Sequence, residues 1–128
     1  MYNAKKMFLT AVSLLGISVV AHADTLAAGA AYGGTAQTLA NCYLYNAGTG
    51  PVTVTSNVII REPNVSVPLT FHNCAALAAG SICAIAANIQ NNVAHACRMV
   101  ISPSGADVRG TLEIRDASGR ILNAVELR

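Results

Sequence analysis

Cysteine and histidine supply most of the chemistry that this sequence could support. The cysteines are Cys42, Cys74, Cys83 and Cys97. An even number of cysteines predicts two disulfides if the chain is exported, as its N-terminal residues indicate below, and three pairings are then possible. We expect Cys74 to pair with Cys83, because the Ala-Gly turn between them can return the chain on itself. This choice leaves Cys42 to pair with Cys97.

A copper site is the alternative use of these residues. His95, Cys97 and Met99 share one phase of a predicted strand, and copper accepts imidazole, thiolate and thioether ligands. A blue-copper site would also need a second histidine after the cysteine, which the sequence lacks, and a free thiolate. We therefore expect no metal and no cofactor. A copper-handling protein that uses His95 and Met99, with His72 as a further candidate ligand, remains the alternative.

Catalytic groups are scarce in this chain. A hydrolase needs a nucleophile, a base and an orienting acid brought together. Only His72 and His95 are histidines beyond residue 23, and Ser102, Ser104 and Ser118 lie in turn-like contexts. Acidic and basic residues alternate along 107–116, which is typical of a solvated sheet face. We expect no catalytic residues and no enzymatic activity.

Two tyrosines are the candidate interaction residues. Tyr43 and Tyr45 lie on the strand face opposite Cys42 and Leu44. Two outward aromatic side chains can anchor a protein or a glycan, because tyrosine adds contact area at low entropic cost. In the alternative interpretation, the Gly-rich segment 24–38 covers these rings.

The N-terminus has the pattern of a secretory signal peptide. Lys5 and Lys6 precede the apolar run Met7–Val20, and Ala21-His22-Ala23 fits a cleavage site. The apolar run is too short to cross a membrane. We therefore predict a signal peptide at 1–23, cleavage after Ala23, no transmembrane anchor, and a periplasmic or secreted protein.

Charge excludes one class of partner. Both lysines belong to the predicted signal peptide, and the rest of the chain has six arginines and six acidic residues. The predicted mature chain is therefore neutral and lacks the clustered cations that a nucleic acid requires. We expect an unidentified periplasmic or extracellular macromolecule as the partner.

The elements that must position these residues are short strands. Alternation predicts strands at 40–46, 52–60, 81–89, 95–102, 108–115 and 120–127, and an edge strand or loop at 65–67. In 52–60, Val52, Val54, Val58 and Ile60 share one phase. About seven strands with turns between them predict an all-β, immunoglobulin-like antiparallel β-sandwich over 39–128. Segment 24–38 is predicted to be flexible or an edge strand.

Three motifs resemble the bacterial Hydin-like (ASH-type) immunoglobulin-like domains. NAGTGPVTV at 46–54 is similar to their N-x-G-[ST]-x-P-[VL]-x-[VI] opening, and CAALAAGSIC at 74–83 resembles their C-x-x-L-x-P-G-x-x-C element. GTLEI at 110–114 is similar to a late strand. Ala79 stands where the family has proline, and this chain has a further cysteine pair. Pilus-chaperone-like sandwiches resemble it more distantly, through architecture alone.

The motifs of this resemblance are turns and disulfides, so it implies a fold and no catalytic group. Together with the residues above, it favours a small exported, disulfide-stabilised module that binds a protein or a glycan, or that has a structural role.

Overall fold

The computed structural model describes residues 22–128. Most of the predicted signal peptide, at 1–21, lies outside the described residues. The elements are β1 (Asp24–Ala27), the 3-10 turn η1 (Gly34–Ala36), β2 (Gln37–Asn46), β3 (Val52–Arg61), β4 (Val65–Val67), β5 (Phe71–His72), β6 (Ala76–Leu77), β7 (Ile82–Asn88), β8 (His95–Ser102), β9 (Val108–Asp116) and β10 (Ile121–Leu127). Across residues 22–128, no helix is long and apolar enough to cross a membrane.

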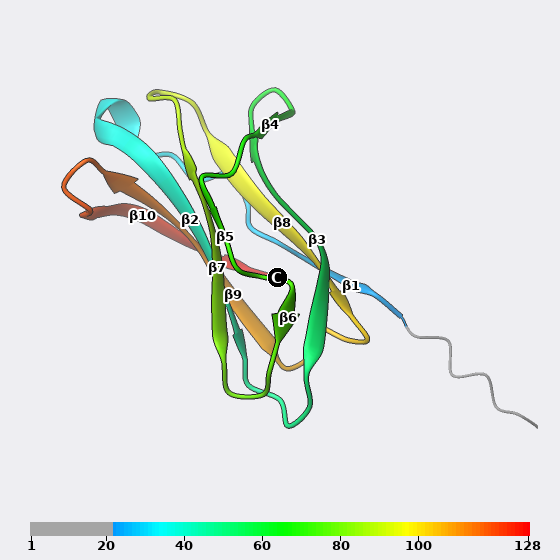
Figure 1. Cartoon of the computed structure of the whole chain (residues 1–128). Helices are drawn as coiled ribbons and strands as arrows, with labels where there is room; N and C mark the ends of the chain where they lie inside the picture. The colour runs from blue at the N-terminus through cyan, green and yellow to red at the C-terminus, as the bar shows by residue number, and fades with distance from the viewer. Residues whose placement is uncertain (1–21) are drawn as a thin grey trace, which may run out of the picture.

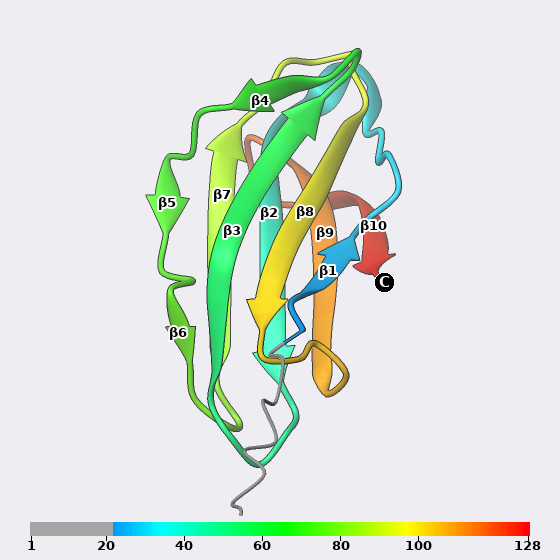
Figure 2. The same ribbon diagram turned by 90° about the vertical axis from the view of Figure 1, so that its right-hand side faces the viewer.

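The strands form two antiparallel sheets that pack face to face (Figures 1 and 2). We call the first the β8 sheet; its order is β1-β8-β3-β4, and β6 also pairs with β3. The second, which we call the β2 sheet, has the order β10-β9-β2-β7-β5. This confirms the predicted all-β antiparallel sandwich. The count is ten strands rather than about seven, because β1, β5 and β6 are too short to show alternation in the sequence.

The core lies between the two sheets, where the inward side chains of the central strands meet. These residues are fully or almost fully buried: Ala40, Cys42, Leu44, Val54, Ile59, Ile85, Cys97, Met99, Ile101, Leu112 and Ile114. In β2, β8 and β9 these residues are spaced by two, because successive side chains of a strand point to opposite faces. The opposite side chains of the β2 sheet therefore point out of the sandwich.

Strand β3 departs from the predicted phase. Its pairing with β8 shifts between Val54 and Ser56, which is a β-bulge. One extra residue moves all later side chains to the opposite face. Ile59 is therefore fully buried, whereas Val58 and Ile60, predicted to share the phase of Val54, are only half-buried.

Within the segment 24–38, only Asp24–Ala27 forms an edge strand, β1, whereas Gly34–Ala36 is a 3-10 turn and Gln37 already begins β2. β1 pairs with β8, and Ala31 forms a further bridge with His95. Ala27 and Arg128 exchange backbone hydrogen bonds of 2.9 and 3.0 Å, so β1 also meets the end of β10. The segment thus lies along the β8 sheet and the side of the sandwich. Tyr45 is 43% exposed and no residue of 24–38 lies beside the two tyrosines, so the segment does not cover these rings as the alternative interpretation expects.

Candidate interaction surface

Both disulfides form as predicted. Cys42 on β2 is joined to Cys97 on β8, with a Cα–Cα distance of 6.5 Å, so this bridge connects the two sheets. Cys74 is joined to Cys83 at 5.1 Å and closes the corner before β7. All four cysteines are buried. Their role is therefore architectural.

The residues of the copper alternative are not brought together. Cys97 is bridged, which removes its thiolate. His95 and Met99 are four positions apart on one strand, about 13 Å at the rise of a strand. His72 lies in the other sheet, where its Nε2 is 3.3 Å from Asn57 Nδ2. Within residues 22–128, no three His, Cys, Asp or Glu side chains gather as a metal site would require.

His95 is buried without hydrogen-bond partners among residues 22–128. Alternation places it in the phase of Cys97 and Met99 but does not predict this lack of partners. The side chain is 1% exposed, and neither ring nitrogen reaches a hydrogen-bond partner. Burial lowers the pKa of His95, because the charged imidazolium would lose its hydration. The backbone of Val93 opposes this shift, and Arg61 and Glu62 act on it with opposite signs. Burial therefore favours the neutral imidazole of His95 over its charged form.

Tyr43 and Tyr45 lie on the outer face of the β2 sheet, as predicted. In the strand register, Tyr43 stands between Ala84 of β7 and Thr111 of β9. Tyr45 stands between Ile82 and Arg109 in the same way. Since β2 is the central strand of its sheet, the backbone that carries both tyrosines is paired with a neighbouring strand on each side.

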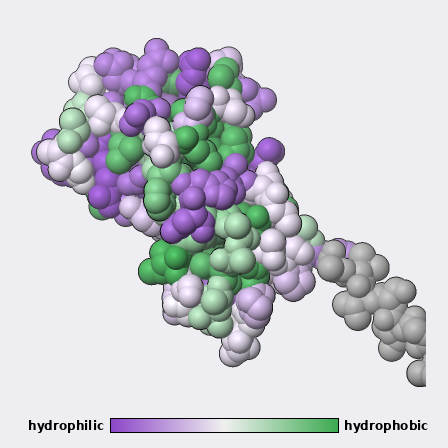
Figure 3. Space-filling view, viewed as in Figure 1, coloured by the Kyte–Doolittle hydropathy of each residue, from purple (hydrophilic) through white to green (hydrophobic). Residues whose placement is uncertain are grey.

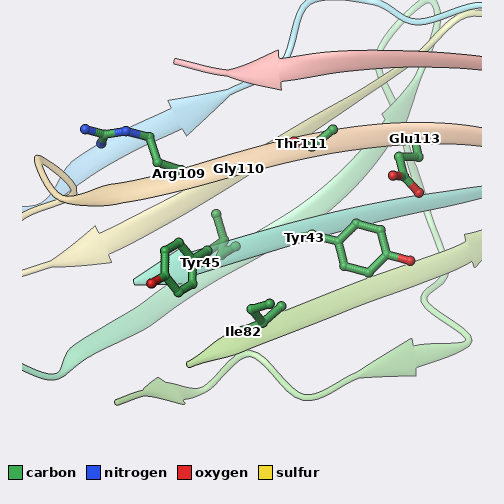
Figure 4. Close-up of a pocket in the computed structure, with 8 residues that line it drawn as sticks. Tyr43, Tyr45, Ile82, Arg109, Gly110, Thr111 and Glu113 are labelled. Atoms are coloured by element: carbon green, nitrogen blue, oxygen red, sulfur yellow. The ribbon is translucent and has the colours of Figure 1, made fainter. Parts of the chain in front are cut away.

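The rings line a shallow depression of about 320 Å³. We call the depression and its rim the tyrosine face; its side chains are Tyr43, Tyr45, Ile82, Arg109, Thr111 and Glu113. Figure 4 shows both rings on one side of β2, with Ile82 of β7 beside them and the β9 residues along the opposite margin. The small side chains of Ala84 and Thr111 next to Tyr43 leave space for this depression.

Exposed apolar side chains extend the tyrosine face beyond the predicted tyrosines. Ile82 is 66% exposed and Tyr45 is 43% exposed, whereas Tyr43 is half-buried. Phe71 of β5 pairs with Ala86 on the same outer face and is 50% exposed. Figure 3 shows hydrophobic surface beside the beginning of β7. The alternation of 81–89 predicts an outward Ile82, which is not among the predicted interaction residues.

The charged side of the tyrosine face is mostly neutralised internally. Nε and Nη2 of Arg115 donate to Glu113 Oε2 at 2.9 and 2.5 Å. These hydrogen bonds raise the pKa of Arg115, and the nearby Tyr43 acts in the same direction. Arg109, at the other end of the face, is exposed and has no such acidic partner within residues 22–128.

Comparison with known proteins identifies no relative of this chain. The chain matches no family model, no curated protein and no solved structure. The resemblance to Hydin-like domains therefore stays a prediction. The function must be inferred from the surface itself.

Proposed function

We propose that this protein is an exported, disulfide-stabilised, immunoglobulin-like module that binds another protein through the tyrosine face and catalyses no reaction. The observation that carries this proposal is the exposure of Ile82 and Tyr45 side by side on the outer face of the β2 sheet. Exposed apolar side chains that gather in one patch are typical of interaction sites.

The composition of the tyrosine face supports a protein partner. Tyrosine and arginine are enriched among the residues that dominate binding energy at protein interfaces. Ile82 adds aliphatic surface that a partner can bury. Each Å² of buried apolar surface contributes about 25 cal/mol of favourable free energy. Both tyrosines are carried by the central strand β2, so no loop has to become ordered when a partner binds.

Export is supported by the cysteines and by the predicted signal peptide. Both disulfides require an oxidising compartment to form and to persist. The sequence pattern at 1–23 supplies the route to that compartment. We therefore place the binding event in the periplasm or outside the cell, and we propose a Hydin-like family for the sandwich.

The test is affinity capture from the native compartment with the wild type and with Tyr43→Ala/Tyr45→Ala. We expect proteins captured by the wild type to be lost with the double variant, because tyrosine is enriched among the residues that dominate binding energy at interfaces. The matched control is Tyr32→Ala, which removes an exposed tyrosine that hydrogen-bonds Asn92 at the other end of the sandwich. An unchanged set of captured proteins in the double variant would show that the tyrosine face is not the binding site.

A further inference from the structure

Arg109 has a guanidinium edge that nothing in the described structure uses. The residue projects from the outer face of β9, opposite Tyr45 in the strand register, and lies on the rim of the tyrosine face (Figure 4). Nη1 donates to the carbonyls of Ala106 and Val108 at 2.8 and 3.0 Å. Among residues 22–128, Nε and Nη2 find no hydrogen-bond acceptor.

This unused edge has the geometry that binds a carboxylate. The Nε and Nη2 hydrogens of arginine point the same way and form a fork that matches a carboxylate. Arg115, on the same face of β9, already uses this edge to hold Glu113. Glu113 is thereby neutralised, so the local excess of charge on the tyrosine face is the positive charge of Arg109.

The neighbouring acid does not satisfy Arg109. Glu126 of β10 lies near Arg109 at the side of the β2 sheet, where its carboxylate accepts from Arg128 at 3.3 Å. The two hydrogen bonds from Nη1 also hold the Arg109 guanidinium at the beginning of β9. A partner carboxylate would therefore meet a fork that is already oriented, which lowers the entropic cost of binding.

We propose that the partner is a polypeptide that places an Asp or Glu side chain on Arg109 and an adjacent apolar side chain on Tyr43, Tyr45 and Ile82. This rests on the proposed function, because it names the chemistry of the partner at the same face. The apolar contact supplies area, and the carboxylate fixes the orientation of the bound segment.

The test uses a displayed library of short random peptides, selected on the oxidised protein. We expect the selected peptides to carry Asp or Glu next to an aliphatic or aromatic residue. Replacing that acid by its amide should weaken binding about tenfold on the wild type, the magnitude of a charge-assisted hydrogen-bonded pair. The same replacement in the peptide should have little effect on its binding to the Arg109→Gln variant.

One further variant separates the effect of the guanidinium geometry from that of the positive charge, and a second serves as a control. Arg109→Lys keeps the charge but lacks the fork, so we expect it to lose most of the preference for the acid. Arg98→Gln is the matched control, because Arg98 is an exposed arginine on the β8 sheet without an ion pair among residues 22–128. It should bind the peptides as the wild type does.

The outcomes distinguish this proposal from the proposed function. Selected peptides that need Tyr43 and Tyr45 but carry no acid, or whose acid contributes equally on Arg109→Gln, would overturn the role of Arg109 and leave the tyrosine face as the site. A selection that yields no peptide dependent on the two tyrosines would overturn both.

Discussion

Ile82 and Tyr45 are the residues that distinguish the two faces of the β2 sheet. The adjacent residues in the chain, Leu44 and Cys83, pair with each other on the inner face and are buried, whereas Ile82 and Tyr45 pair on the outer face and are exposed. An exposed isoleucine beside an exposed tyrosine contributes nothing to the core. Its contribution is available to a partner instead, which is the basis of the proposed function.

His95 predicts a pH dependence of stability. Its pKa is lowered in the fold by burial, so below the ordinary pKa of histidine, near 6.5, the unfolded chain binds a proton that the folded chain does not. The free energy of unfolding should therefore be fully retained above about pH 6.5 and fall as the pH drops towards the folded-state pKa, by at most about 1.4 kcal/mol per pH unit.

Urea unfolding between neutral and mildly acidic pH measures this effect. His95→Leu removes the titrating ring and its unsatisfied nitrogens, so its unfolding free energy should depend less on pH than that of the wild type. His72→Gln is the control, because His72 is exposed on β5, and it should retain the acid-induced loss. Equal pH dependence in His95→Leu and the wild type would contradict the assignment to His95.

At the scale of elements, the two disulfides stabilise different parts of the fold. Cys42–Cys97 spans a sequence separation of 55 and joins the two sheets, whereas Cys74–Cys83 spans 9 and closes one corner. On the chain-entropy model, the long loop contributes about 4.2 kcal/mol and the short one about 2.7 kcal/mol. Cys42→Ala/Cys97→Ala should therefore reduce the free energy of unfolding more than Cys74→Ala/Cys83→Ala.

Chemical denaturation of the two double variants tests this order. Each variant removes one buried bridge and leaves the other, so each is the matched control for the other. A larger loss from the short loop would show that the corner before β7 stabilises the fold more than the link between the sheets does.

Several elements could be predicted from alternation, and others could not. β8 begins and ends where predicted, at His95 and Ser102, because its alternation is uninterrupted. The bulge in β3 was missed, since one inserted residue changes the phase of Ile59 without changing the apolar composition of the strand. The short β5 and β6 were missed because two residues carry no period.

The candidate site could be predicted in part. Alternation placed Tyr43 and Tyr45 outward, and the structure confirms this orientation. The depression could not be predicted, because it depends on which strands lie beside β2 and so on the register that brings Ile82 and Arg109 to Tyr45. The free edge of Arg109 depends on hydrogen bonds to the carbonyls of Ala106 and Val108, which no sequence pattern predicts.

At the scale of the whole molecule, the tyrosine face is supported by the buried core on the inner side of the same sheet. The inter-sheet bridge lies under β2, next in sequence to Tyr43, and the core packs against the inner side of the same strand. The tyrosine face is therefore held by the most buried part of the protein. Such an arrangement suits a surface that binds without changing shape.

Site-specific photo-cross-linking in the living cell tests the central claim most directly. A photoreactive amino acid is placed at Ile82, on the tyrosine face, and separately at Val65, which is 40% exposed on β4 of the other sheet. We predict a cross-linked adduct of discrete mass from position 82 and none from position 65. An adduct from position 65 alone, or no adduct from position 82, would contradict binding through the tyrosine face.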